Sequence, residues 1–264
     1  MNVETIWVRG FSVSSGVFTE DGLFHQKSLP VLSVVQALEG AYEFGLTPDG
    51  QQRVDAPGAF VAPSGRMQYI THRVHPATGV MRAQWLFLDV LVNQTMRLDD
   101  LFDFPSVLPA ACAEPVRTLL GEVASAGSLC GQLAALYRLL DVLLPLGQQK
   151  EPANAFAQEV RAYVEQHCGE ALSDEQLARH LAVSRPTLYR RFQQQFHRTP
   201  AHYINDVRLS RAIVLLETTN LPLWAVSEAI GLRDPFYFSR LFRRKYGTSP
   251  SLYRRQFGGR PEGD

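Results

Sequence analysis

Hydrophobic and polar positions repeat near the end of the chain, fifty residues apart. Six positions of a first segment recur in a second one with their apolar, basic or proline character kept: Leu188/Phe238, Arg190/Arg240, Phe192/Phe242, Phe196/Tyr246, Pro200/Pro250 and Tyr203/Tyr253. Because apolar residues fall at three- and four-residue steps in both segments, each predicts a helix with one buried face. The repeat therefore predicts two copies of one helical unit.

Each copy carries the start and stop signals of two helices joined by a tight turn. In the first copy Ser173 and Gln176 have the spacing of a capping box, and Ser184 is placed to cap a second helix. In the second copy Gly231 marks the turn and Asp234-Pro235 begins the second helix. A second helix with one apolar and one basic face is what reading of a DNA major groove requires.

The segment between the copies predicts a long connecting helix. Thr199-Pro200 and Ser249-Pro250 predict the start of a further short helix in each copy. Residues 203–217 then contain regularly placed apolar residues and no breaker, which predicts one continuous helix. At 1.5 Å per residue this helix is about 20 Å or more long. It can therefore hold two reading helices near the separation of about 34 Å between successive turns of the major groove.

Charge divides the chain into two unlike halves, although the formal net charge is zero. Residues 1–150 contain ten Lys and Arg against fourteen Asp and Glu, and residues 151–264 contain sixteen against twelve. Residues 185–260 contain fourteen basic residues, thirteen of them arginines, against four acidic ones. Any single arginine is equally well explained by a solvated helix face. The whole set, spread over a duplicated helical unit, favours binding to DNA phosphates and guanine edges.

Residues 160–257 resemble the DNA-binding domain of the AraC family of bacterial transcription regulators. The resemblance rests on Leu177-Ala178, Ser184, Leu188, Arg190, Phe192, Tyr203-Ile204, Arg208-Leu209-Ser210-Arg211-Ala212, Ala229-Ile230-Gly231-Leu232, Asp234-Pro235-Phe236-Tyr237-Phe238-Ser239-Arg240-Leu241-Phe242, Tyr246-Gly247-Thr248-Ser249-Pro250 and Tyr253-Arg254. The second of the two motifs is long and specific. The resemblance implies two subdomains that read adjacent major grooves.

The exposed side of each second helix supplies the candidate DNA contacts. The base-reading candidates carried over from the family are Pro186, Tyr189 and Arg190 in the first copy and Phe236, Tyr237, Ser239 and Arg240 in the second. The phosphate candidates are Arg185, Arg191, Arg198, Arg243, Arg244 and Lys245. Pro186 cannot donate a hydrogen bond, so we expect that position to read methyl groups or DNA shape. Tyr203 and Tyr253 are predicted to pack inside their units.

The first half of the chain has the short segments and turn signals of an antiparallel β domain. Strands are predicted at 31–38, 41–46, 53–55, 59–62, 68–74 and 80–90, a spacing typical of a barrel or jelly roll. Helical periodicity follows at 112–120 and 130–146. The apolar face at 133–144 predicts either a dimer seam, which we favour, or a cover over the barrel.

The predicted fold is therefore α+β and multidomain. A cupin-like sensor barrel occupies 1–107, a helical dimerisation or cover segment 108–147, a linker 148–155, the DNA-binding domain 156–258 and a tail 259–264. Within the DNA-binding domain the first helix-turn-helix lies at about 173–200, the linker helix at 201–217 and the second helix-turn-helix at 222–250.

This layout, together with Pro57-Gly58-Ala59-Phe60-Val61-Ala62-Pro63, resembles AraC-type regulators with a cupin-like sensor domain. The resemblance implies an effector-responsive activator that dimerises, binds double-stranded DNA and contacts RNA polymerase. It also implies a small-molecule effector inside the barrel. Tyr42, Arg82, Gln84 and Trp85 are the candidate effector-binding residues, and barrel wall is the competing interpretation of each.

The alternative function is a metal-dependent cupin enzyme fused to a DNA-targeting domain. His72 and His75 are three apart and His25 lies elsewhere, but no further cluster follows with ligand spacing. No phosphate-binding loop or nucleophile motif is present in the sequence. We therefore expect no metal, no cofactor and no catalytic residue. A further alternative is a regulator whose barrel no longer binds a ligand.

Cysteine use and hydropathy predict the compartment. Cys112, Cys130 and Cys168 are widely spaced and odd in number, which favours reduced thiols. The sequence shows no charged start leading into an apolar signal segment, and no apolar run that approaches the length of a membrane span. We expect a cytoplasmic protein that has no membrane partner and forms a homodimer.

Overall fold

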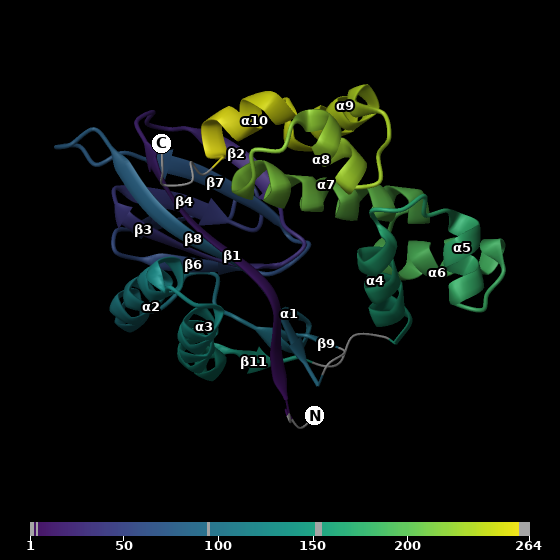
Figure 1. Cartoon of the computed structure of the whole chain (residues 1–264), viewed down its shortest axis with the longest axis horizontal. Helices are drawn as coiled ribbons and strands as arrows, with labels where there is room; N and C mark the ends of the chain where they lie inside the picture. Colours follow the sequence, from purple (N-terminus) through teal and green to yellow (C-terminus); the bar gives the residue numbers. More distant parts are fainter. Residues whose placement is uncertain (1–2, 4, 94–95, 151–154, 259–264) are drawn as a thin grey trace. The chain divides into compact units, whose positions relative to one another are not determined.

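The computed structural model describes residues 3, 5–93, 96–150 and 155–258. These residues form two compact units, an N-terminal unit that ends at Lys150 and a C-terminal unit at 155–258. The N-terminal unit is built on antiparallel sheets and the C-terminal unit is helical (Figure 1). The predicted fold class is confirmed. Half of the predicted linker, residues 151–154, and the predicted tail at 259–264 lie outside the described residues.

Two antiparallel sheets form a jelly roll in the N-terminal unit. The strands are β1 (Ile6–Phe18), β2 (Phe24–Ser28), β3 (Leu32–Glu39), β4 (Ala41–Gly45), β5 (Gln52–Asp55), β6 (Ala59–Ala62), β7 (Met67–Arg73), β8 (Met81–Val92) and β9 (Met96–Arg97). One sheet has the order β1-β8-β3-β6 with β9 beside β8, and the other has the order β2-β7-β4-β5. Strands β1 to β4 and strands β5 to β8 each alternate between the two sheets, as the predicted jelly roll requires.

Three strands of the two sheets, β1, β2 and the short β9, were missed by the sequence prediction, whereas β3 to β8 agree with it. Strand β1 lies at an edge of its sheet and contains serines and glycines, and few of its residues are buried. Strand β2 is also an edge strand, and its buried residues His25, Lys27 and Ser28 are polar. Both strands therefore lack the alternation of apolar and polar residues on which the prediction relied.

Short elements follow the jelly roll. Helix α1 (Leu98–Leu101) leads into β10 (Phe102–Asp103), which pairs with β11 (Gln148–Gln149). A part of the predicted linker is thus a strand of the N-terminal unit.

Aromatic side chains from the two sheets pack against one another inside the jelly roll. The ring of Phe44 on β4 stacks on Phe60 on β6 at 3.9 Å between centroids, and Tyr42 meets Phe60 edge-on at 5.3 Å. Phe18 on β1 contacts His72 on β7 at 4.1 Å. Because each pair joins one sheet to the other, these contacts define which faces of the strands point inward.

The opposite face of the five-stranded sheet is covered by α2 (Ala113–Ser125) and α3 (Leu129–Leu143) (Figure 1). One buried cluster joins this face to both helices, and it contains Leu86, Leu88, Val90, Val116, Leu120, Leu136, Leu140 and Leu143. The favoured prediction of a dimer seam at 133–144 is therefore wrong for this face. The alternative, a cover over the barrel, is what the structure shows.

The sequence analysis found no apolar run that approaches the length of a membrane span, but α3 and the residues after it form one by length and composition. Residues Leu129–Leu146 have the length and the mean hydropathy, 1.4, of a candidate span. Five residues of α3 are buried in the cluster described above, and Arg138 forms an ion pair with Glu122 of α2 at 2.5 Å. This segment packs as an amphipathic helix of a folded unit.

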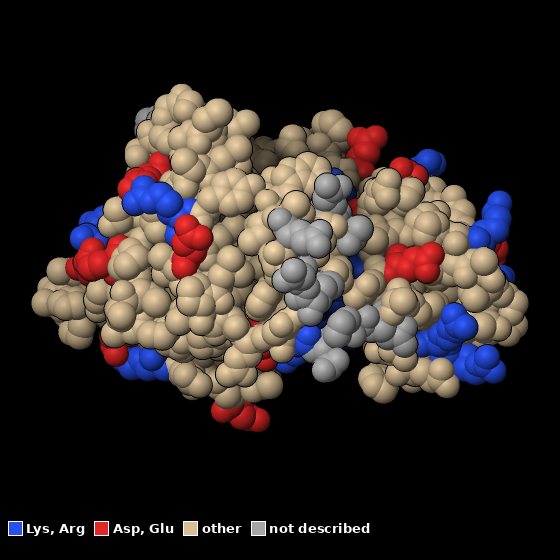
Figure 2. Space-filling view, turned by 90° about the horizontal axis from the view of Figure 1, so that it is seen from below, with Lys and Arg blue, Asp and Glu red and all other residues tan. Residues whose placement is uncertain are grey.

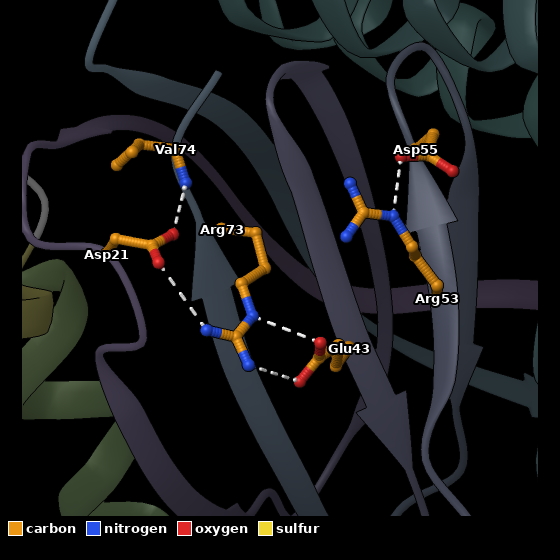
Figure 3. Close-up of polar contacts among 6 residues, drawn as sticks. All are labelled: Asp21, Glu43, Arg53, Asp55, Arg73 and Val74. Carbon is orange, nitrogen blue, oxygen red and sulfur yellow. Dashed lines mark hydrogen bonds and ion pairs between the residues drawn. The ribbon is translucent and has the colours of Figure 1, made fainter. Parts of the chain in front are cut away.

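Ion pairs stabilise the outer face of the four-stranded sheet (Figure 3). The guanidinium of Arg73 donates from Nε and from a terminal nitrogen to the two carboxylate oxygens of Glu43, both at 3.0 Å. It also approaches Asp21, which accepts a hydrogen bond from the amide of Val74 at 3.1 Å. The two carboxylates raise the pKa of Arg73. These contacts attach the β1–β2 turn and β4 to β7.

The C-terminal unit contains two helix-turn-helix units on either side of one long helix. Its helices are α4 (Ala155–His167), α5 (Asp174–His180), α6 (Arg185–Phe196), α7 (Pro200–Thr218), α8 (Leu223–Ala229), α9 (Pro235–Tyr246) and α10 (Pro250–Phe257). The first helix-turn-helix is α5–α6 and the second is α8–α9. The short helix predicted to begin at Thr199-Pro200 is continuous with the connecting helix, and together they form α7. Helix α4 was not predicted.

We predict that the stability of the N-terminal unit decreases between pH 7 and pH 5. Burial lowers the pKa of His72 from 6.5 to about 3, and burial together with the charges of His72 and Lys27 lowers that of His25 well below 6.5. The unfolded chain then binds more protons than the folded one below pH 6.5, so stability is complete above that pH and falls beneath it. The expected loss at pH 5 is about 2 kcal/mol for His72, and His25 contributes in the same direction.

The measurement is urea unfolding at both pH values, followed by the fluorescence of Trp7 and Trp85 in a Trp224→Phe background. In the His72→Leu variant we expect this loss to be smaller by about 2 kcal/mol. Equal pH dependence in the two proteins would contradict the assignment.

Candidate nucleic-acid interface

Side-chain caps fix the start of both reading helices, α6 and α9. Ser184 Oγ accepts a hydrogen bond from the amide of Thr187 at 3.4 Å, and Asp234 Oδ1 accepts one from the amide of Phe236 at 2.8 Å. The capping box of Ser173 and Gln176 is also present at the start of α5. These caps confirm the predicted helix starts.

Each reading helix buries one stripe and exposes the opposite one. Leu188 and Phe192 of α6 are fully buried, in a cluster with residues of α4, α5 and α7. Phe238 and Phe242 of α9 are equally buried. Both helices are 12 residues long. Because the repeated apolar positions of each helix point inward, the predicted base-reading positions on the opposite side point outward.

The two turns reach the left-handed region by different residues. Ala182 has a φ of 51° in the first turn, and Gly231 has a φ of 75° in the second. A Cβ atom at Gly231 would lie 2.5 Å from the carbonyl oxygen of Cys168. Only glycine fits there, because both the backbone conformation and the available space exclude a side chain.

On the first reading face Tyr189 and Arg185 are held by acidic residues of α5. The hydroxyl of Tyr189 donates to the carboxylate of Asp174, which raises the pKa of Tyr189. Arg185 pairs with Glu175 at 2.8 Å. Arg190 is exposed and has no hydrogen bond or ion pair within the part of the chain that the structure describes. The neighbouring candidate Pro186 is exposed as well.

The second reading face is aromatic and basic. The side chain of Phe236 is 79% exposed and that of Tyr237 is 39% exposed. The guanidinium carbon of Arg240 lies 5.9 Å from the centre of the Tyr237 ring, which helps to orient it. Ser239 is half-buried, and its hydroxyl donates to the carbonyl oxygen of Pro235 at 2.9 Å.

The other phosphate candidates, besides Arg185, fall into two groups. Arg243 and Arg244 are exposed on α9, and Arg191 is exposed with its guanidinium 5.3 Å from the Phe156 ring. Arg198 and Lys245, in contrast, both contact the carboxylate of one α7 residue, Asp206, at 2.6 and 2.8 Å. Lys245 is only 16% exposed and is paired with Asp206, which disfavours its predicted role as a phosphate contact. Such a contact needs an ammonium that faces solvent.

Charge is distributed in small groups on the face drawn in Figure 2. Basic and acidic side chains lie in separate or mixed clusters there, with uncharged surface between them. This pattern agrees with a chain whose formal net charge is zero. Attraction to DNA therefore depends on local arginines, such as those of α6 and α9, rather than on the charge of the whole chain.

Two of the four effector candidates lie on the wrong side of the sheet. Tyr42 and Trp85 are buried, and Tyr42 contacts inward-facing Phe60 and His72. The amide of Gln84 instead donates to the carbonyl oxygen of Arg117 on α2, and Arg82 pairs outside with Glu39. Neighbouring residues of a strand alternate between faces, so Arg82 and Gln84 cannot share a face with Trp85.

Other polar residues, missed in the sequence, do face the interior of the jelly roll. Gln68 lies on the same face of β7 as His72, and Ser33 pairs with Phe87, whose ring lies 5.2 Å from Lys27 on the opposite sheet. The Gln68 amide, the Ser33 hydroxyl and the Trp85 indole nitrogen are buried. All three lack a hydrogen-bond partner among the described residues. Such groups normally bind water or a ligand.

The histidines do not form a three-ligand site. His25 and His72 lie 5.2 Å apart between ring centres, whereas His75 is in a loop, where its Nδ1 accepts from the amide of Ala77. Within the described ranges no group of three His, Cys, Asp or Glu residues is arranged to hold a metal ion. The alternative of a metal-dependent enzyme gains no support from the geometry.

Comparisons with known proteins agree with the duplicated helical architecture. A family model described as a helix-turn-helix domain matches residues 177–256. The chain is 30% identical over 223 residues to the arabinose operon regulatory protein of Escherichia coli, covering 78% of this chain and 74% of that protein. It is also 30% identical over 139 residues to the Msm operon regulatory protein of Streptococcus mutans, covering 53% of this chain. That alignment spans only half of the relative's length.

Among solved structures the chain is similar to ToxT from Vibrio cholerae. The TM-score is 0.66 at 9% identity, with 95% of this chain and 100% of ToxT covered. This similarity extends over both units and concerns the fold alone.

We predict that loss of either cap loosens the corresponding reading helix. In Ser184→Ala and Asp234→Ala the first turn loses a side-chain acceptor, which costs about 1 kcal/mol. Amide hydrogen exchange, followed by mass spectrometry of peptides from α6 and α9, is expected to accelerate about fivefold in the affected helix only. The matched control is Ser251→Ala, an exposed serine in α10 that caps no helix. Unchanged exchange in both cap variants would contradict the prediction.

Proposed function

The chain belongs to the AraC family of transcription regulators, and we propose that it binds double-stranded DNA sequence-specifically through α6 and α9. The observation that carries this proposal is the pair of capped helices, each with its repeated apolar stripe buried and its arginine-bearing face exposed. Helix α7 between them has 19 residues and is about 28 Å long. Two adjacent major grooves on one side of a duplex suit this spacing.

The exposed residues suggest different reading chemistry in the two units. Arg190 and Arg240 have the planar donors that pair with guanine O6 and N7. Phe236 and Pro186 offer only apolar contact, which suits thymine methyl groups. Arg191, Arg243 and Arg244 are the proposed phosphate contacts, since each is exposed beside a reading face.

We further propose that the interior of the jelly roll binds a small polar effector. Gln68 offers both donors and an acceptor, Ser33 offers either, and the indole nitrogen of Trp85 offers a donor. A ligand that satisfies all three carries both hydrogen-bond donors and acceptors. Tyr42 and the Trp85 ring supply apolar surface beside these groups. An arabinose operon regulatory protein among the relatives makes a sugar a reasonable first ligand to test.

Homodimer formation, contact with RNA polymerase, activation of transcription and a cytoplasmic location complete the proposal. They rest on membership of the family. The covered apolar face of α3 is not the dimer contact in this scheme. The protein acts as a regulator and not as an enzyme.

We predict that Arg190→Ala and Arg240→Ala each weaken specific DNA binding by about 1–3 kcal/mol and relax the base preference at one position. Arg243→Ala is expected to weaken binding to all sequences alike and to reduce the salt slope by about 1. The measurement is a mobility-shift titration at several salt concentrations, with a duplex selected from random DNA by the wild-type protein.

The control is Arg66→Ala, which removes an exposed arginine from the N-terminal unit. If neither Arg190→Ala nor Arg240→Ala weakened specific binding more than this control, the assignment of the reading faces would be wrong.

We predict that a bound polar effector changes the fluorescence of Trp85. Arabinose and related pentoses are titrated into a Trp7→Phe/Trp224→Phe background, in which Trp85 is the remaining tryptophan. Gln68→Leu is expected to weaken binding at least about tenfold, because it removes hydrogen bonds to the ligand. Gln84→Leu, on the face of the five-stranded sheet that is covered by α2, is the matched control. Equal effects of the two substitutions would contradict the assigned interior site.

A further inference from the structure

One carboxylate on α7 joins the two helix-turn-helix units. Asp206 Oδ2 contacts the guanidinium of Arg198 at 2.6 Å, and its Oδ1 contacts Lys245 Nζ at 2.8 Å. Arg198 follows the first reading helix, and Lys245 lies near the end of the second. The backbone oxygen of Asp206 also accepts from Lys245 Nζ at 3.3 Å. We call these three residues the Asp206 bridge.

The bridge is partly removed from solvent, which gives it more weight than a surface ion pair. Lys245 is 16% exposed and Asp206 is 34% exposed. Burial lowers the pKa of Lys245, and the charge of Asp206 opposes that effect. Loss of the carboxylate would remove the negative charge that Asp206 supplies to a largely buried ammonium, and such a change is costly.

A second set of contacts, made by Arg208 and the turn at Gly231, also joins the two helix-turn-helix units. Arg208 on α7 donates to the carbonyl oxygens of Cys168 and Glu170 at 2.9 and 2.8 Å. Those residues follow α4 in the first unit, and they face the turn of the second unit. The position of a Cβ at Gly231 would be 2.5 Å from the Cys168 oxygen and 2.9 Å from that of Glu170. The two units therefore touch directly and are not connected by α7 alone.

We infer that the Asp206 bridge is a positioning device, which sets the separation and rotation at which the two reading helices meet DNA. This inference rests on the proposed function. Because Asp206 on α7 contacts both Arg198 and Lys245, neither helix-turn-helix unit can rotate freely about the α7 axis. One extra base pair rotates one half-site by about 35° relative to the other. A rigid reader cannot follow that rotation without losing contacts, whereas a loosened one can.

The same geometry explains why Arg198 and Lys245 differ from the remaining phosphate candidates. Both cations share the one carboxylate of Asp206, whereas Arg243 and Arg244 remain exposed. Lys245 thus determines the spacing of the two half-sites and not the affinity for phosphate.

The test compares spacing preference in the full chain. The probe is the duplex selected from random DNA by the wild-type protein, together with versions that carry one added or one deleted base pair between the half-sites. We expect the insertion to weaken wild-type binding at least about thirtyfold. For Asp206→Asn and Lys245→Met we expect a penalty below about fivefold, with an unchanged salt slope.

Several controls keep the outcomes distinct. Glu228→Gln removes the charge of an exposed carboxylate on α8 and should keep the wild-type spacing penalty. Circular dichroism verifies folding, and Lys245→Met, which keeps an apolar stem and leaves no buried ammonium, carries the test if Asp206→Asn unfolds.

Three results overturn the inference. The first is an unchanged spacing penalty in the bridge variants. The second is a uniform loss of affinity in Lys245→Met with a salt slope lower by about 1, which would make Lys245 a phosphate contact. The third is failure to select any duplex, which would also remove the proposed function. If all variants bound the selected duplex normally and showed equal spacing penalties, the inference about the Asp206 bridge would fail and the proposed function would stand.

Discussion

Burial of the repeated apolar stripe is the interaction on which the C-terminal unit depends. In each reading helix two aromatic or leucine side chains are completely removed from water, and this burial determines which residues remain outside. The outward direction of Arg190 and Arg240 is a consequence of where Leu188 and Phe238 pack. No separate interaction of the arginines is therefore needed to expose them. It is the solvent side of a helix oriented by its core.

The two units of the chain solve different packing problems. The jelly roll buries aromatic rings between its sheets and aliphatic residues under α2 and α3, and its interior still retains unpaired polar groups such as Gln68. Burial of polar groups weakens a core unless they are hydrogen-bonded, so their retention favours a binding role. The helical unit instead places several of its polar groups in helix caps and in the contacts of Asp206 and Arg208.

How well a feature could be predicted from the sequence depends on how far apart along the chain the interacting residues lie. The caps at Ser184 and Asp234 act on residues two or three positions away, so both reading helices were predicted correctly. The partner of Lys245 is 39 residues distant, and no local pattern indicates it. The edge strands β1 and β2 lack apolar alternation and were missed for that reason. The misplacement of Gln84 was avoidable, because strand alternation separates it from Trp85.

The side-chain caps have a kinetic consequence. In the described chain five helices of the C-terminal unit, namely α5, α6, α7, α9 and α10, begin at a Ser, Thr or Asp that bonds to its own first turn. The jelly roll, by comparison, must pair Ile6 with Val92 before β1 is in place. Because loop closure slows folding and local contacts accelerate it, the DNA-reading half should acquire its structure faster than the sensor half, although it is synthesised last.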